Sequence, residues 1–177
     1  MISRIKLYLS RAVRFVISGE PKVFVRVDSV QQGKLLFGKN IIITGASSGI
    51  GYEIAKKCLL EFGNVMCVAR NEEKLMAAIE KLKNETGNDD VHYLQWDIAD
   101  ISVCENKCRK AIDLLGGHID CLVNSAGMTS KVNIADCTPE QWDNIFNVNL
   151  KGLFFITSEF VKQFVRQESG GNIVNIA

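Results

Sequence analysis

A glycine-rich segment early in the chain carries the chemistry of a phosphate-binding turn. It reads Thr44-Gly45-Ala46-Ser47-Ser48-Gly49-Ile50-Gly51, and it lies between an apolar run and a helical pattern. Glycine lets the backbone turn tightly and approach a ligand, while the first turn of a helix offers unpaired N–H groups and the positive end of its dipole. The segment is not a P-loop, because no Gly-Lys-Ser/Thr follows. It predicts a turn that cradles the pyrophosphate of a dinucleotide, with a purely structural turn as the alternative.

A second chemical group follows the next apolar run, Asn64–Ala69. Arg70 and Asn71 come directly after this run, and no acidic residue occurs before Glu72. In a dinucleotide site, an acid at this place would accept a hydrogen bond from the ribose 2′-OH, whereas a cation would bind a 2′-phosphate. The planar, permanently charged guanidinium of Arg70 suits a phosphate. The sequence therefore favours NADP(H), with a solvated surface arginine as the alternative.

These groups need elements that bring them to one place, and the sequence predicts alternating strands and helices. Apolar runs of strand length occur at 40–44, 64–69, 91–96, 119–124 and 172–177, with helical patterns between them at about 50–62, 72–85, 101–115 and 139–168. The last pattern is expected to bend near 147–152. Such alternation implies right-handed crossovers and a parallel sheet covered on both faces. The expected fold is an α/β, three-layer, doubly wound parallel sheet of the Rossmann-like kind.

Three helix starts are marked by capping residues. Asn71 precedes two glutamates, Ser102 is followed three residues later by Glu105, and Thr138-Pro139-Glu140-Gln141 combines a capping box with proline at the first helical position. We therefore expect helices to begin directly after these capping residues.

Five motifs resemble those of the short-chain dehydrogenase/reductase family, in the same order and approximate spacing, over about Gly38 to Ala177. They are the turn Thr44–Gly51, Asp97 in Trp-Asp-Ile-Ala-Asp, Asn124-Ser125-Ala126-Gly127, Asn147-Val148-Asn149-Leu150, and Gly171-Asn172-Ile173-Val174-Asn175-Ile176. In the third motif a serine replaces the second asparagine of the family. The resemblance implies that Asp97 lies near the adenine ring and that Asn149 joins a proton relay. The alternative for Asn149 is a buried asparagine at a helix bend with satisfied hydrogen bonds. The resemblance also favours NADP(H), because arginine at the place of Arg70 usually accompanies this cofactor.

These observations give one set of candidate residues. The cofactor-binding candidates are Thr44, Gly45, Ser47, Ser48, Gly49, Ile50, Gly51, Arg70, Asn71, Asp97, Ile98, Asn124, Ala126 and Gly127, and the catalytic candidate is Asn149. No metal site is expected, because the six cysteines include no Cys-x-x-Cys and the two histidines lie in unrelated segments. The cysteines are interpreted as free structural thiols.

The catalytic pair that the resemblance implies is not found at the expected place. In the family, a Tyr-x-x-x-Lys helix after the fifth strand supplies a proton and holds the nicotinamide ribose, while a serine orients the substrate. Tyr52-Glu53-Ile54-Ala55-Lys56 fits the string, but it opens the helix behind the glycine-rich turn, so we interpret it as ordinary helix. Because the predicted fifth strand ends at Ala177, the chain is expected to be truncated, with C-terminal strands and helices missing, and to be inactive as given.

The favoured functional hypothesis is an NADP(H)-dependent oxidoreductase. It would transfer hydride between NADPH and a small carbonyl or alcohol substrate, and in complete form it would be a homo-oligomer. The alternative is a non-catalytic dinucleotide-binding or subunit-interaction module. A methyltransferase is disfavoured, because its loop follows an acidic strand end and spaces the glycines differently. The 177 residues, with 21 Lys and Arg against 20 Asp and Glu, indicate a single domain and argue against a nucleic-acid partner.

The N-terminal region has a different character from the rest of the chain. Residues 1–36 are expected to form a basic amphipathic helix and an arm, ahead of the dinucleotide-binding domain at 37–177. Before Glu20 the chain has four cations and no acid, and its apolar residues share one helical face. The helix could pack on its own domain or on a partner subunit, contact a membrane surface through residues 1–17, or act as an organellar presequence. No apolar run reaches the ~20 residues of a membrane span, so the expected location is cytoplasmic, with a membrane surface or an organelle as alternatives.

Overall fold

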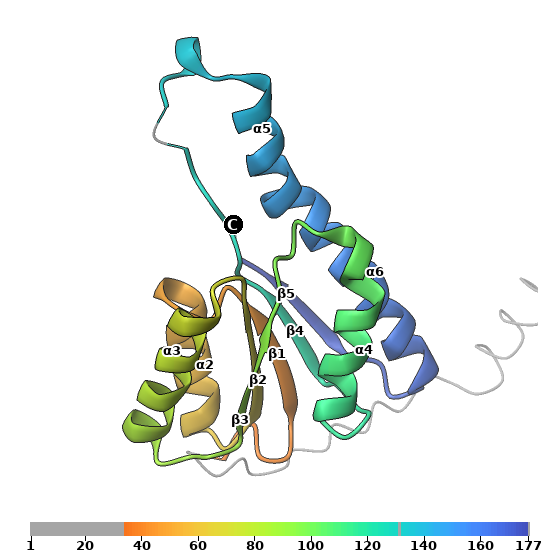
Figure 1. Cartoon of the computed structure of the whole chain (residues 1–177). Helices are drawn as coiled ribbons and strands as arrows, with labels where there is room; N and C mark the ends of the chain where they lie inside the picture. Colours follow the sequence, from red (N-terminus) through yellow and green to blue (C-terminus); the bar gives the residue numbers. More distant parts are fainter. Residues whose placement is uncertain (1–33, 131, 177) are drawn as a thin grey trace, which may run out of the picture. The chain divides into compact units, whose positions relative to one another are not determined.

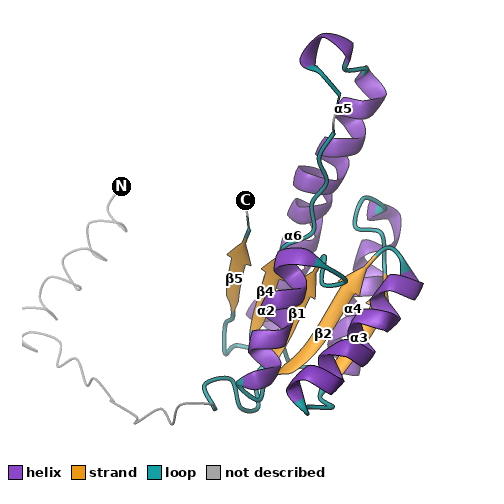
Figure 2. Cartoon of the chain, turned by 90° about the vertical axis from the view of Figure 1, so that its left-hand side faces the viewer, coloured by secondary structure: helices purple, strands orange, loops and turns teal. Residues whose placement is uncertain are grey.

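The computed structural model describes residues 34–130 and 132–176, which form a five-stranded parallel sheet between two layers of helices (Figures 1 and 2). The strands are β1 (Asn40–Thr44), β2 (Asn64–Ala69), β3 (Val91–Gln95), β4 (Cys121–Asn124) and β5 (Asn172–Asn175), in the order β3-β2-β1-β4-β5. The expected α/β, three-layer, doubly wound fold is confirmed. The order reverses between β1 and β4, which in such sheets is where ligands bind. The helix and arm expected over 1–36 lie outside the described residues, except for 34–36.

Each face of the sheet is covered by two long helices. Helices α2 (Gly49–Leu60) and α3 (Glu72–Thr86) pack on one face, and α4 (Cys104–Leu114) and α6 (Leu153–Arg166) pack on the other (Figure 2). Strand β1 shows why both layers are needed, because Ile41 and Ile43 belong to the α2–α3 core and Ile42 belongs to the α4–α6 core. All three isoleucines are almost completely buried. A strand without a polar face must be covered on both sides.

Two of the three predicted helix starts agree with the structure. The Asn71 side chain accepts a hydrogen bond from the backbone N–H of Lys74, and both hydrogen bonds of the Thr138–Gln141 capping box are present. The start predicted at Ser102 is wrong. Asp100 caps a short 3₁₀ turn, Ile101–Val103, by accepting from the Ser102 N–H, and the α-helix begins only at Cys104. An aspartate two residues upstream therefore captures the donor that the capping box would have used.

The long C-terminal helical region is interrupted at 147–152, where the sequence predicted a break or a bend. Helix α5 (Pro139–Phe146) runs into a π-helical segment (Asn147–Gly152) and then into α6. Gly152 lies against the backbone carbonyl of Ile98, and a Cβ at this position would collide with that carbonyl. Helix α5 stands away from the sheet and buries none of its residues (Figure 1).

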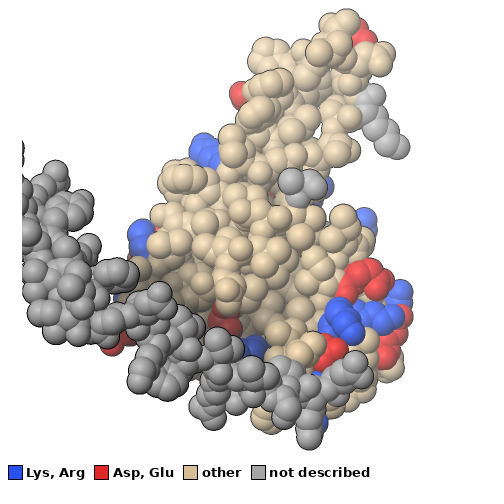
Figure 3. All heavy atoms as spheres, turned by 180° about the vertical axis from the view of Figure 1, so that it is seen from behind, with Lys and Arg blue, Asp and Glu red and all other residues tan. Residues whose placement is uncertain are grey.

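The surface is unevenly charged. Seen from behind, charged side chains gather over the end that carries α3, whereas the protruding region of α5 shows few (Figure 3). Within residues 34–130 and 132–176, no helix has both the length and the hydropathy that a membrane span requires.

Candidate functional site

A cleft of about 480 Å³ opens at the carboxyl ends of the strands, where the order of the sheet reverses. Eleven of the fourteen cofactor-binding candidates line it: Gly45, Ser47, Ser48, Ile50, Gly51, Arg70, Asn71, Asp97, Ile98, Ala126 and Gly127. They come from the loops after β1, β2, β3 and β4, which lie far apart in the sequence. Lining residues outside the set of fourteen candidates include Lys74, Trp96, Met128 and Val148.

The glycine-rich turn is packed so closely that two of its positions exclude any side chain. Gly45 has a φ of +72°, and a Cβ on it would lie 2.7 Å from the Cα of Ala126 in the loop after β4. A Cβ on Gly51 would lie 2.5 Å from the carbonyl oxygen of Gly45. Gly49, with a φ of +60°, has open space where a Cβ would be, and it lines an outer groove rather than the cleft. At Gly45 and Gly51 the turn therefore brings backbone rather than a side chain to the cleft.

Thr44 was predicted to bind the cofactor, but the structure places it beneath the cleft. It is 1% exposed and is not among the residues that line the cleft. Its Oγ1 accepts hydrogen bonds from the backbone N–H groups of Ser125 and Ala126, both at 3.1 Å, and donates to the carbonyl of Val123 at 3.5 Å. The hydroxyl thus ties the end of β1 to the loop after β4 and positions the glycine-rich turn.

Asn124 and Asn149 also lie outside the lining of the cleft. Asn124 is 3% exposed, and its Nδ2 donates to Thr157 Oγ1 at 3.0 Å and to Asn175 Oδ1 at 2.9 Å. The amide of Asn149 donates to the carbonyl of Met128 at 2.9 Å and accepts from its N–H at 2.8 Å. The alternative interpretation of Asn149 is right about satisfied hydrogen bonds and wrong about burial, because the residue is exposed. Both asparagines hold neighbouring segments in place.

One end of the cleft is rich in hydrogen-bond donors. Arg70 and Lys74 are exposed, and within residues 34–176 neither side chain has an ion-pair partner. Ser47 and Ser48, directly before α2, line the same cleft. Sequence reasoning missed Lys74, although its place four residues after Arg70, in the first turn of α3, could have indicated it. Positive charge and hydroxyl donors together suit an anionic group.

The loop after β3 contributes both a carboxylate and an apolar wall. One oxygen of Asp97 accepts a hydrogen bond from the N–H of Ala99 at 3.0 Å, and the side chain is exposed. Ile98 is 6% exposed and Trp96 is 2% exposed, and both line the cleft. Apolar lining beside an accessible carboxylate suits a heteroaromatic ring that carries an N–H donor.

Tyr52 and Lys56, which fit the Tyr-x-x-x-Lys string, join α2 to α3. The Tyr52 hydroxyl donates to Glu85 Oε2 at 3.0 Å, and Lys56 Nζ lies 2.9 Å from the same oxygen. Burial, with the Glu85 hydrogen bond, raises the pKa of Tyr52 to about 12. Such a tyrosine is a poor proton donor near neutral pH, so the pair is structural, as its place in the sequence indicated.

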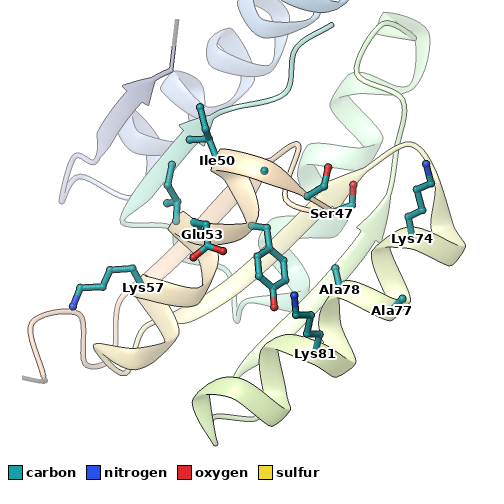
Figure 4. Close-up of a pocket in the computed structure, with 12 residues that line it drawn as sticks. Ser47, Ile50, Glu53, Lys57, Lys74, Ala77, Ala78 and Lys81 are labelled. Carbon is teal, nitrogen blue, oxygen red and sulfur yellow. The ribbon is translucent and has the colours of Figure 1, made fainter.

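Outside the cleft, a groove lies between α2 and α3 (Figure 4), and Tyr52 is among the residues that line it. In this view Ser47 and Lys74 lie toward one end of the groove and Lys57 toward the other, with Lys81 between them. Four residues line both the groove and the cleft: Ser47, Ser48, Ile50 and Lys74. The two hollows therefore meet at these residues.

Comparison with known proteins shows which family shares this architecture. A family model described as short chain dehydrogenase matches residues 39–177. An uncharacterized oxidoreductase from Staphylococcus epidermidis is 35% identical over 139 residues, which are 78% of this chain and 57% of that protein. Another from Thermotoga maritima is 34% identical over 143 residues, 81% of this chain and 54% of that protein. The chain thus spans little more than half the length of these curated relatives.

Solved structures agree with the fold. A short chain dehydrogenase from Mycobacterium smegmatis superimposes with a TM-score of 0.75 at 28% identity, covering 84% of this chain and 60% of that one. Actinorhodin polyketide ketoreductase, solved with NADPH, superimposes with a TM-score of 0.72 at 31% identity, covering 78% of this chain and 52% of that one.

Proposed function

Because the chain belongs to the short-chain dehydrogenase family, we propose that residues 37–177 form the NADP(H)-binding part of an oxidoreductase that acts on a small carbonyl or alcohol. The observation that carries the proposal is the cleft at the reversal of strand order, where loops from four strands converge. A sheet of this kind binds ligands outside the carboxyl ends of its strands.

The residues of the cleft fit a dinucleotide. At Gly45 and Gly51 a side chain would collide with neighbouring backbone. The turn is therefore bare backbone at these two positions and can approach a pyrophosphate closely, while the N–H groups at the start of α2 face it. Ser48 is the N-cap residue of α2, yet its side chain makes no capping hydrogen bond, which leaves its hydroxyl available. Asp97 and Ile98 would hold the adenine ring. When bound, NADPH supplies the hydride.

Preference for NADP(H) is assigned to Arg70. Its guanidinium lines the cleft without an ion-pair partner in the described chain, and a guanidinium can bind a phosphate through two parallel hydrogen bonds. The NADPH in the solved ketoreductase relative supports the same assignment.

Proton transfer is the step for which we assign no group in these 177 residues. The family resemblance assigns it to a tyrosine and a lysine after the fifth strand, whereas Tyr52 and Lys56 both contact Glu85 on α3. Asn149 is proposed as a positioning residue, since it holds the backbone of Met128 at the rim of the cleft. We therefore expect the 177-residue chain to bind NADPH without reducing a carbonyl. Measurable reduction by this chain would contradict that expectation.

The test of the cofactor assignment is equilibrium binding of NADPH and NADH to the chain. Arg70→Glu should weaken NADPH binding by roughly 10- to 100-fold, because a charge-assisted hydrogen bond contributes ~1.5–3 kcal/mol, while NADH binding changes little. Arg109→Glu is the matched control, because Arg109 is an exposed arginine on α4 that pairs with Glu105. Equal losses for both nucleotides would refute the assignment. If the native chain bound neither nucleotide, the whole proposal would fail and the non-catalytic interaction module would be favoured.

We also propose that the complete protein is a homo-oligomer. Helix α6 supports this, because it is apolar on two sides: Ile156, Phe160 and Phe164 are buried, whereas Phe154, Val161 and Val165 are exposed. A helix that is apolar on both sides is normally covered on both.

A further inference from the structure

An apolar patch lies at the amino ends of the strands, at the opposite end of the sheet from the cleft. This amino-end patch consists of four exposed side chains: Leu35, Phe37, Leu60 and Phe62. The turn before β1 and the end of α2 carry two of them each, and both segments lie at this end of the sheet (Figure 2). Glu61 joins the two segments, because its Oε2 accepts from the N–H of Leu35 at 3.3 Å and its carbonyl accepts from the N–H of Leu36 at 3.0 Å. Exposed apolar side chains that gather in this way mark a contact surface.

The backbone at Phe62 adds an independent observation. Its φ is +60°, in the left-handed region that favours glycine and that costs other residues free energy. The side chain is 48% exposed, so burial within the described chain offsets little of this cost. Strained positions of this kind cluster at sites that contact a ligand.

Lysines border the patch with their charged ends outward. Lys39 Nζ lies 2.7 Å from Asp120 Oδ1, and Lys57 Nζ lies 3.2 Å from Glu61 Oε1. In each pair the lysine side chain is the more exposed partner, at 53% against 17% and at 71% against 12%. Lys34, directly before the patch, is exposed as well. The ammonium groups therefore lie outside the carboxylates, and this rim presents positive charge.

Toward β3 the sign of the charge changes. The side chain of Asn88 donates to the carbonyl of Leu59 near the end of α2, and the exposed Asp89 and Asp90 follow it. Lys83 lies 3.9 Å from Asp89. The positive rim thus belongs to the side of the patch that the turn before β1 and α2 form.

The chain that precedes the patch has the same character in its sequence. Before Glu20 it has four cations and no acid, with apolar residues at helical spacing, and it joins the described residues at Lys34. Two successive parts of the chain therefore combine apolar side chains with positive charge. One such signal gives a protein marginal, reversible attachment to a lipid surface, whereas two together give stable attachment.

We propose that the amino-end patch binds the surface of an anionic lipid bilayer. The four apolar side chains enter the boundary between headgroups and acyl chains, and the rim lysines contact the acidic headgroups. A second copy of this chain fits the patch less well, because a two-fold contact would place the lysine rim against itself. The cleft opens at the other end of the sheet, so a bilayer at the patch leaves it accessible.

The experiment is sedimentation of the 177-residue chain with vesicles of phosphatidylcholine, either alone or with about 30% phosphatidylserine. The native chain should bind the vesicles that contain phosphatidylserine, and added salt should weaken this binding by screening the charges. The double substitution Phe37→Gln and Phe62→Asn should weaken it by roughly tenfold or more, because two aromatic side chains no longer leave water. Asparagine tolerates the positive φ of position 62, so circular dichroism should show an unchanged fold.

The double substitution Lys34→Gln and Lys57→Gln tests the rim, and it should weaken binding to the anionic vesicles by roughly tenfold. Met76→Gln with Lys151→Gln is the matched control. Met76, on α3, is as exposed as Phe62, and Lys151 is an exposed lysine of the π-helical segment. Since both lie outside the patch, this variant should bind within about twofold of the native chain.

The inference is overturned if the native chain binds neither kind of vesicle, or both equally. It is also overturned if the patch variants bind as the native chain does while Arg4→Gln, Arg11→Gln and Arg14→Gln together abolish binding, because the N-terminal segment then acts alone. Patch variants that change the mass measured by light scattering, but not vesicle binding, would assign the patch to a protein partner instead. None of the four patch residues lines the cleft, so titration with NADPH tests the proposed function separately.

Discussion

Gly45 and Gly51, in the turn after β1, are needed because the backbone around them is packed too closely to leave room for a side chain. Gly51 lies so close to the carbonyl of Gly45 that a methyl group between them would be 2.5 Å from that oxygen. Gly45 in turn lies against the loop after β4, which the hydroxyl of Thr44 fixes. The shape of the turn therefore depends on residues that never reach the cleft.

At this residue scale, Gly51→Ala should lower the free energy of unfolding by ~1–3 kcal/mol through overpacking and should abolish measurable binding of NADPH. Gly87→Ala is the comparison, because Gly87 has a φ of +64° at the end of α3 but open space around it. It should cost about 1 kcal/mol through backbone strain alone and leave binding unchanged. Denaturant unfolding and NADPH titration separate the two effects. Unchanged binding in Gly51→Ala would show that the turn tolerates a side chain.

At the element scale, helices α2 and α3 carry part of the lining of the cleft, and one polar cluster joins the two helices. Glu85 on α3 accepts from Tyr52 and lies within ion-pair distance of Lys56 and Lys81, and the ammonium of Lys81 lies 5.1 Å from the centre of the Tyr52 ring. Ser48 is the N-cap of α2 and Lys74 lies in the first turn of α3, so the cluster joins the two helices from which these residues reach the cleft.

At the element scale, Tyr52→Phe should change how stability depends on pH. The pKa of Tyr52 is raised to about 12 by burial and by Glu85, whereas an unfolded tyrosine titrates near ~10. The stabilisation is therefore fully present below pH ~10 and is lost as pH rises through about 12. Tyr52→Phe should be less stable by about 1 kcal/mol at neutral pH, and the difference from the native chain should shrink above pH ~10.

Urea unfolding at several pH values measures this difference. Tyr93→Phe is the control, since Tyr93 is 38% exposed on the outer strand β3, and its curve should run parallel to that of the native chain. A constant difference between native chain and Tyr52→Phe up to pH ~12 would contradict the role given to the Glu85 cluster.

At the scale of the whole molecule, the two sides of the sheet differ in how much apolar surface they leave exposed. Toward α2 and α3, apolar side chains from β1, β2 and both helices form one closed core. Toward α4 and α6 the core is closed as well, but α6 presents a second apolar stripe to the outside, and the outer strand β5 leaves Val174 43% exposed. An exposed stripe of this kind favours contact with another protein surface.

At the scale of the whole molecule, we expect the chain to associate with a second copy through this stripe. The double substitution Val161→Lys and Val165→Lys should lower the mass measured by light scattering to that of one chain. It should do so without loss of helix content, because both positions are exposed. Met76→Lys is the matched control on α3, where Met76 is 48% exposed, and it should leave association unchanged. A native chain that is monomeric at every concentration would contradict this expectation.

Local physics explains why so much of this fold could be predicted from the sequence. Strands buried on both faces appear as continuous apolar runs, and the predicted β1 and β2 have the bounds that the structure gives. The caps at Asn71 and Thr138 act over three residues and were predicted correctly. The cap predicted at Ser102 is wrong because the side chain of Asp100, two residues away, accepts the hydrogen bond of the Ser102 N–H.

By itself, the sequence determined the alternating elements, the glycine-rich turn and the position of Arg70 at the end of β2, because each depends on neighbours within a few residues. Only the tertiary structure decided which side chains reach the cleft. Thr44 and Asn124 are buried by contacts with residues more than 30 positions away, Asn149 hydrogen-bonds to Met128, and Lys74 lines the same cleft as Ser47. Exposure is a property of packing between distant segments, and no local pattern encodes it.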